Sequence, residues 1–267
     1  MNGDVLLDVS GVKLTLGETK ILDGVSFQIV DRVREGAVTG QVVSLLGPSG
    51  VGKTRLLRII AGLDAPDAGT VRGHENAVLH AGSVGVVFQD YPLLRHRTVE
   101  SNLLLAGMIG GLTDAASRKR AKELLSTFGL SERGDFYPAQ LSGGQKQRAA
   151  IAQQLMVPRR LLLMDEPFSG LDPAALEDVM KLLVDVANLD ELNTIVVVTH
   201  DIRAAMAVSD TLFMLGRDRK GDKVVPGAKI QGTYDLVALD LCWRDDVQGL
   251  PSFAKLEQEI KARFRTL

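Results

Sequence analysis

A glycine-rich segment at residues 47–54 constrains the fold of this 267-residue chain more than any other feature. Residues 42–46 before it are mainly apolar, as in a buried strand, and residues 56–60 after it have the composition of a helix. Glycines let the backbone turn its N–H groups toward a polyphosphate, and the start of a helix adds partial positive charge. The pattern predicts a phosphate-binding loop made of Gly47, Pro48, Ser49, Gly50, Val51, Gly52, Lys53 and Thr54.

The last two residues of this loop indicate the kind of ligand. The Lys53 ammonium can reach the β and γ phosphates of a nucleotide, and the Thr54 hydroxyl can ligate Mg²⁺. The alternative is a glycine-rich turn that matches the motif by chance. Every fixed position of the motif is filled and both flanking elements are expected, so we predict a nucleoside triphosphate with Mg²⁺.

Composition excludes several other classes of protein. The formal net charge of −2 gives no overall electrostatic reason to bind nucleic acid, and a local basic patch is the alternative that this charge leaves open. Cys242 is the only cysteine, so no disulfide framework or thiolate metal cluster is expected. No apolar run approaches the roughly 18 to 20 residues needed to cross a bilayer, and the first residues do not have the pattern of a signal peptide. We therefore expect a cytoplasmic protein that reaches a membrane only through a partner.

Hydrophobic periodicity predicts an α/β organisation in which helices interrupt a sheet. The first two strands should pair antiparallel around a turn at residues 17–18, whereas the continuously apolar later strands should be parallel and covered on both faces. Between about residues 98 and 158 the strand-like runs stop, and the last apolar run, at 211–215, is predicted to be an outer strand. Strands are expected at residues 5–9, 24–30, 83–88, 161–165, 195–199 and 211–215, and helices at 99–105, 115–128, 145–155, 173–187 and 252–264.

Two carboxylates follow one of the predicted buried strands. Four apolar residues at 161–164 precede Asp165 and Glu166, at the carboxyl end of the strand, where ligands bind in α/β sheets. If Asp165 faces Thr54, it can ligate Mg²⁺, and Glu166 is then free to polarise an attacking water. The alternative, an acidic turn without function, is disfavoured by the complete phosphate loop.

A histidine ends the next predicted strand. His200 follows the apolar run at 195–199, and there it can hydrogen-bond a γ-phosphate and help to hold the water. A core histidine satisfied by its neighbours is the alternative.

A second helix start points to a dimer. Ser142, Gly143, Gly144 and Gln145 open a predicted helix and form a second anion-binding N-terminus. Lys53 is already predicted to bind the terminal phosphate, so this second site is redundant in one chain. It becomes useful if it closes over a nucleotide bound by a second chain, as in a two-fold dimer with composite sites. A simple capped helix would explain the serine but not the paired glycines, which weaken a helix.

These segments, in this order, resemble the ATP-binding subunit of ABC transporters over about residues 5 to 217. The resemblance implies a P-loop NTPase fold: a RecA-like core with an N-terminal antiparallel β subdomain and a helical subdomain inserted at about residues 92–158. It implies an ATPase domain over 1–235 and a helical tail over 236–267. It also implies that Glu166 is the catalytic base and that Gln89 senses Mg²⁺ and the attacking water. By the same resemblance, Asp172 lies in the dimer contact and Ser142 reaches the γ-phosphate across it.

The function implied is that of an ATPase subunit on the inner face of the membrane. It would act as a homodimer or with a paired ABC ATPase, energise transmembrane permease subunits, and work with a solute-binding protein. The surface at residues 91–94 would receive a short helix of the permease, which would select the cargo. Its length, its single compact cassette and Pro167-Phe168 most resemble bacterial importers of the nitrate, sulfonate and taurine type. Export or lipid movement is the alternative.

Two other functions are alternatives to a transporter ATPase, and the sequence departs from the family pattern at two places. A soluble ABC-type ATPase that acts on nucleic acid or ribosomes usually has two cassettes or a long coiled-coil insertion, and this chain has neither. A small-molecule kinase would leave residues 142–145 and His200 without a role. The family usually has an aromatic residue where this chain has Leu16, and residues 31–40 form a longer connection than usual.

Overall fold

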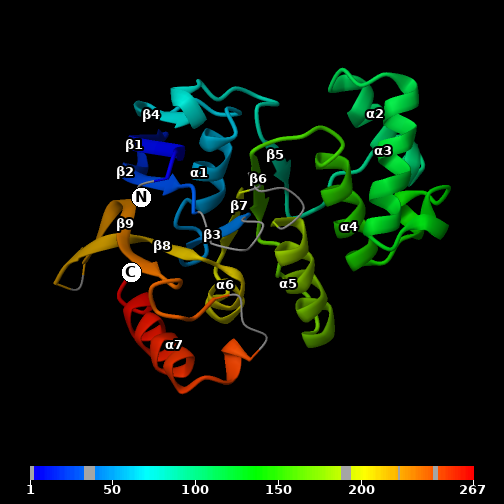
Figure 1. Cartoon of the computed structure of the whole chain (residues 1–267). Helices are drawn as coiled ribbons and strands as arrows, with labels where there is room; N and C mark the ends of the chain where they lie inside the picture. The colour runs from blue at the N-terminus through cyan, green and yellow to red at the C-terminus, as the bar shows by residue number, and fades with distance from the viewer. Residues whose placement is uncertain (1–2, 33–39, 188–193, 222, 243–245) are drawn as a thin grey trace.

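The computed structural model describes residues 3–32, 40–187, 194–221, 223–242 and 246–267. Across these residues nine strands form one sheet in the order β4-β1-β2-β9-β8-β3-β7-β6-β5, with helices on its faces (Figure 1). The strands are β1 (Val5–Leu16), β2 (Thr19–Val30), β3 (Gln41–Leu46), β4 (Ala68–Gly73), β5 (Gly85–Val87), β6 (Leu161–Asp165), β7 (Thr194–Thr199), β8 (Thr211–Lys220) and β9 (Lys223–Asp235).

The core of the sheet is parallel and covered on both sides. β3 pairs with β7 and β8, and β6 pairs with β5 and β7, all in parallel. Alternate residues of β7 face opposite ways: Val196 and Val198 pack in one cluster with Leu56 of α1 (Lys53–Ile60), whereas Ile195 and Val197 pack in another with Leu183 of α5 (Pro173–Ala187). Burial on both faces explains the continuously apolar strands.

The N-terminal strands form the antiparallel end of the same sheet. β1 pairs antiparallel with β2 and with β4, as predicted for the first two strands. This end joins the core where Leu22 of β2 pairs with Ala228 of β9. The prediction of an outer strand at 211–215 was wrong, because β8 lies between β3 and β9. β9 was not predicted, because its glycines and charged residues obscure the period of a strand.

The helices between β5 and β6 stand together at one end of the molecule (Figure 1). They are α2 (Val99–Ile109), α3 (Asp114–Thr127) and α4 (Gly143–Gln154), and they contact one another. Leu103, Leu124 and Ile151 share one apolar cluster with strand residues of the core. The insertion is therefore a helical unit that rests on the sheet, as the predicted helices at these positions indicate.

The C-terminal segment folds back onto the core. Helix α7 (Pro251–Phe264) contacts α6 (Ile202–Val208), and its residues Phe253, Leu256 and Ile260 are buried. They share a cluster with Leu46, which ends β3. Whether residues 236–267 form a separate tail remains a prediction. None of the helices in the described parts of the chain has the length and apolar character required to cross a bilayer. The remaining short helices are η1 (His74–Asn76), η2 (Ser131–Arg133), η3 (Pro138–Gln140) and η4 (Val247–Gly249).

Candidate nucleotide-binding site

The phosphate loop lies between β3 and α1, as predicted. Gly52 caps α1 with φ 116°, a left-handed conformation that favours glycine. Gly47 is needed for a different reason: a Cβ at this position would lie 2.5 Å from the Leu215 carbonyl oxygen of β8. The loop thus turns sharply while touching a neighbouring strand, which places its backbone N–H groups at the start of α1.

Lys53 is buried beneath this loop. Its side chain is 6% exposed, and its Nζ donates to the carbonyl oxygens of Gly47 (2.9 Å) and Pro48 (3.1 Å). The same Nζ lies 3.3 Å from Glu166 Oε1. An ammonium has three N–H donors, and these three oxygens already provide an acceptor for each of them. A phosphate that binds Lys53 has to replace some of these contacts.

Thr54 and Asp165 provide the oxygens predicted for Mg²⁺. Asp165 ends β6 and is 5% exposed, and Thr54 Oγ1 donates to its Oδ1 over 3.2 Å. Burial raises the pKa of Asp165, and the hydrogen bond from Thr54 opposes that rise. Among the residues that the structure describes, no group of three or more His, Cys, Asp or Glu side chains could hold a metal. The residues fit Mg²⁺ nonetheless, because this ion is usually held by one or two carboxylates together with substrate phosphates.

Glu166 is held in a fixed position beside the loop. Its φ of 49° is unusual for a non-glycine residue, and its N–H donates to the Val198 carbonyl of β7 over 2.8 Å. Its Oε2 accepts from Thr199 Oγ1 (3.1 Å) and lies 2.9 Å from His200 Nδ1. The fold therefore brings together Lys53, Glu166 and His200, which are far apart in the sequence.

Gln89 is linked to this group indirectly. It follows β5, and its Nε2 donates to Ser169 Oγ over 3.3 Å. The Ser169 N–H donates in turn to the Glu166 carbonyl oxygen over 3.2 Å. Gln89 thus contacts the turn that carries Glu166.

The Ser142 group lies elsewhere on the molecule. Ser142 caps α4: its Oγ accepts from the Gln145 N–H (3.3 Å), and its own N–H donates to Gln145 Oε1 (3.0 Å). A Cβ at Gly143 or Gly144 would meet nothing within 4 Å, so packing within the described residues does not require these glycines. Beside them is a cavity of about 380 Å³ that Asp172 also lines and that residues 47–54 do not.

Sequence reasoning missed three residues that contact the site. Thr199 bonds Glu166, Gln147 of α4 donates to the Pro167 carbonyl oxygen over 3.0 Å, and Arg217 of β8 donates to the Gly50 carbonyl oxygen over 3.0 Å. Thr199 could have been found from the sequence, because it carries a hydroxyl at the end of a predicted strand. The other two bond backbone carbonyls, which no residue pattern reveals.

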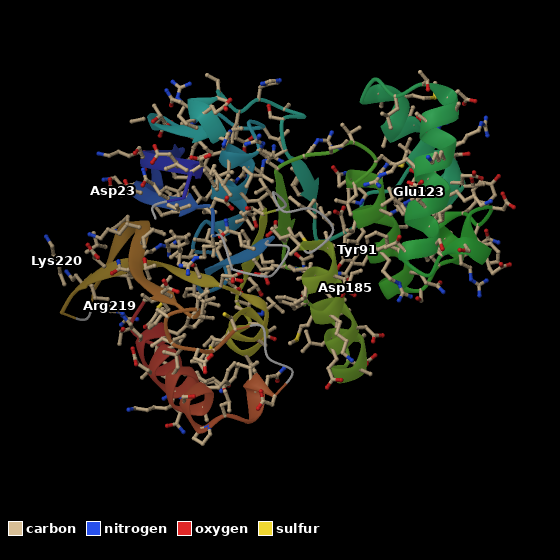
Figure 2. The ribbon with its side chains drawn as sticks, in the orientation of Figure 1. Asp23, Tyr91, Glu123, Asp185, Arg219 and Lys220 are labelled. Carbon is tan, nitrogen blue, oxygen red and sulfur yellow. The ribbon has the colours of Figure 1, made fainter. Side chains whose placement is uncertain are left out.

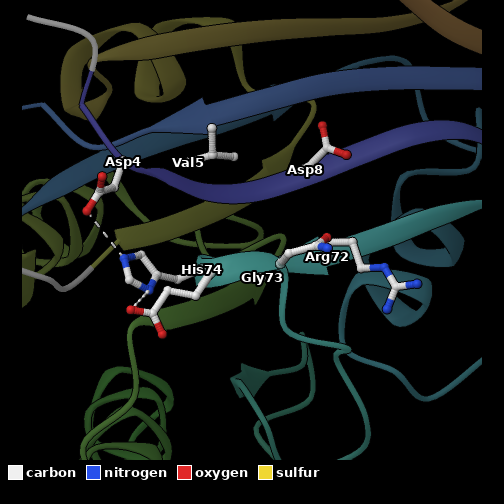
Figure 3. A pocket seen from close by; sticks show the side chains of 8 residues that line it. Asp4, Val5, Asp8, Arg72, Gly73 and His74 are labelled. Atoms are coloured by element: carbon white, nitrogen blue, oxygen red, sulfur yellow. Dashed lines mark ion pairs between the residues drawn. The ribbon is translucent and has the colours of Figure 1, made fainter.

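The two departures and one further hollow lie outside this arrangement. Leu16 is 42% exposed at the β1–β2 turn, and most of residues 31–40 fall outside the described residues. A hollow of about 520 Å³ lies between β1 and the end of β4 (Figure 3), where His74 Nε2 is 3.5 Å from Asp4 Oδ2. Neither the loop nor the carboxylates at 165–166 line it.

The fold and this geometry define a class. A glycine-rich loop between β3 and α1, together with carboxylates at the carboxyl end of parallel β6, is the arrangement of P-loop nucleotide-binding proteins.

Comparisons with known proteins identify the family. The ABC transporter family matches residues 30–169. The "Sulfate/thiosulfate import ATP-binding protein CysA" of Halalkalibacterium halodurans is 40% identical over 225 residues, which cover 79% of this chain and 63% of that protein. The protein of the same name from Synechococcus elongatus is 42% identical over 199 residues, which cover 73% of this chain and 57% of that protein.

A solved structure agrees over nearly the whole chain. The structure of cbiO1 from Clostridium perfringens, part of the ABC transporter complex cbiONQ, has a TM-score of 0.74 and 26% identity, and the match covers 98% of this chain and 96% of that one. This chain therefore belongs to the ABC transporter family. The resemblance stated from the sequence and the predicted P-loop NTPase fold are confirmed. The chain spans about 60% of the length of the two CysA relatives.

Proposed function

We propose that this chain hydrolyses ATP as a two-fold dimer and energises the import of a solute through separate permease subunits. The observation that carries the proposal is the Glu166 carboxylate, which lies within 3.3 Å of both Lys53 Nζ and His200 Nδ1, beside the phosphate loop. A carboxylate among hydrogen-bonding partners at a phosphate site can orient and deprotonate an attacking water.

Each residue of the group then has one role. The loop N–H groups and Lys53 bind the phosphates, while Thr54, Asp165 and Gln89 would hold Mg²⁺, which supplies charge neutralisation when bound. Glu166 accepts the proton of the water, because its carboxylate is held in place by Thr199 and His200. His200 has a half-exposed side chain, which leaves it free to bond the γ-phosphate.

The dimer follows from the Ser142 group. No atom of the described residues within 4 Å would obstruct a Cβ at Gly143 or Gly144, so packing against these residues does not explain the two glycines, and an approaching partner molecule would. A partner's γ-phosphate at the N-terminus of α4 fits, because backbone N–H groups and the helix dipole stabilise negative charge there. Asp172, beside the same cavity, already caps α5 through the N–H groups of Ala174 and Ala175, so it is a rigid part of the proposed contact.

The permease would bind near residues 91–94, and a solute-binding protein would act with it. Tyr91, labelled in Figure 2, has φ 47°, and burial raises its pKa to about 12. Leu94 is 38% exposed. Such a surface fits a short helix from a membrane protein. The chain would then lie in the cytoplasm against the inner face of the membrane.

The relatives bear on the direction of transport and on the cargo. Both CysA proteins are named for sulfate and thiosulfate import, so the comparisons favour import over the alternative of a soluble ATPase acting on nucleic acid or ribosomes. Pull-down of a permease, rather than of RNA or DNA, would distinguish these functions. The permease recovered would also indicate the cargo.

Phosphate release by the purified chain tests the reaction. We expect Glu166→Gln to slow hydrolysis by at least about 100-fold, the range expected for loss of a general base, while ATP still binds. Glu123→Gln, an exposed change on α3 (Figure 2), is the control and should leave the rate unchanged. Ordinary turnover by Glu166→Gln would reject Glu166 as the base. Absence of hydrolysis by the unmodified chain, alone and with its permease, would reject the function.

A further inference from the structure

One buried glutamine connects helix α4 of the helical unit with the turn that follows β6. Gln147 lies on α4 and is 0% exposed. Its Nε2 donates to the Pro167 carbonyl oxygen over 3.0 Å. Ser142 starts the same helix, and Glu166 immediately precedes Pro167. This single bond therefore connects the helix that begins at Ser142 with the turn that carries the proposed base.

The turn depends on contacts of this kind. Glu166 has a left-handed backbone conformation, which costs free energy and persists only where surrounding contacts impose it. β7 supplies one contact, from the Glu166 N–H to the Val198 carbonyl, and Gln89 supplies another through Ser169. Gln147 supplies the contact from the helical unit.

The chemistry of Gln147 indicates a role for this bond beyond packing. Its Oε1 is buried and has no hydrogen-bond partner among the described residues. A half-satisfied buried amide is unfavourable, and an apolar side chain of the same size would avoid that cost. The N–H donors are thus the part of the residue that the structure uses.

We infer that Gln147 is a positioning residue that transmits the position of α4 to Glu166. In the proposed dimer, Ser142 of one chain binds the nucleotide held by its partner. If this binding shifts α4, the Pro167 carbonyl moves with it, and Glu166 is positioned toward the nucleotide of its own chain. The inference rests on the proposed function.

The test compares two glutamines of the same helix. Gln147→Met removes the donor while keeping the length and flexibility of the side chain. Gln153→Met is the matched control, because Gln153 Nε2 also donates to a backbone carbonyl, that of Asn102 (3.5 Å), but within the helical unit. We expect Gln147→Met to lower kcat by about tenfold or more with KM for ATP unchanged, since small misplacements of a catalytic group are costly. Gln153→Met should retain both values.

A double-mutant comparison separates positioning from a structural role. If Gln147 acts through Glu166, adding Gln147→Met to Glu166→Gln should not lower the residual rate further, and the double variant should still pair on Mg·ATP. Independent losses, or an unchanged kcat in Gln147→Met, would overturn the inference while wild-type hydrolysis keeps the proposed function intact. Should Gln147→Met not fold, Gln147→Leu replaces it in the same comparison.

Discussion

Two glycines of this chain have opposite surroundings, and the contrast can be tested. Gly47 stands against the Leu215 carbonyl, whereas Gly143 has open space where a Cβ would be. We expect Gly47→Ala to lower the free energy of unfolding by about 1 to 3 kcal/mol through overpacking. Gly143→Ala should leave it unchanged or raise it by up to about 1 kcal/mol, because alanine favours helix. Urea unfolding of both variants measures the difference.

The same Gly143→Ala variant should nevertheless lose activity. In the proposed dimer its methyl group would stand where a partner's phosphate approaches, so we expect hydrolysis to fall by about tenfold or more, as for other losses of phosphate-stabilising contacts. A stable variant with normal phosphate release would show that the glycine serves no partner.

At this scale the sequence predicted positions well and contacts poorly. Lys53, Asp165, Glu166 and His200 were expected near one another because each lies at the end of a buried strand or in the loop after one. Gln147 and Arg217 were missed because each bonds a backbone carbonyl. Such a contact depends on how elements pack, which residue types alone do not specify.

At the scale of elements, an ion pair links helix α1 to the segment just beyond its C-terminus. Arg58 donates to Asp64 through Nε (2.7 Å) and Nη2 (2.8 Å). This two-pronged bond lowers the pKa of Asp64. A carboxyl group with a lowered pKa adds stability above its ordinary value of 3.8, and loses it as the pH falls through the lower folded value. The pair should therefore steady the helix that presents the phosphate loop at neutral pH.

We expect Asp64→Asn to reduce the free energy of unfolding by about 1 kcal/mol at pH 7, since the pair is partly exposed. The gap between variant and wild type should close as the pH drops below 3.8. The control is Asp23→Asn (Figure 2), whose carboxylate meets Lys20 at 3.3 Å and Lys13 at 3.8 Å. Urea titrations across this pH range measure both, and a gap that persists in acid would contradict the assignment.

The elements themselves were predicted where the period was clear. The apolar runs at 161–165 and 195–199 coincide with β6 and with nearly all of β7, and the inserted helices were expected in place. β9 was missed, and β8 was placed at the edge. The outer part of β8, with Arg219 and Lys220 (Figure 2), projects from the molecule. This part lacks the burial that makes a strand recognisable in the sequence.

At the scale of the whole molecule, the proposed function gives the chain two halves of a nucleotide site, which lie apart from each other. The phosphate loop with Glu166 is one half, and Ser142 with its two glycines is the other. The cavity at the second half is lined by α4, α5 and the segment between β6 and α5. The sequence predicts such a division, since one terminal phosphate does not need two anion-binding helix starts in one chain, and the division stays a prediction. In the proposed dimer, pairing of two copies would join the halves.

Mixing two defective chains tests this claim most directly. Both carry Glu166→Gln to block hydrolysis; one also carries Lys53→Ala and the other Ser142→Arg. A mixed pair contains one complete site, formed by Lys53 of one chain and Ser142 of the other. Light scattering with Mg·ATP should give twice the mass of one chain for the mixture and the single mass for each variant alone. A mixture that stays at the single mass, under conditions where Glu166→Gln itself pairs, would contradict the account.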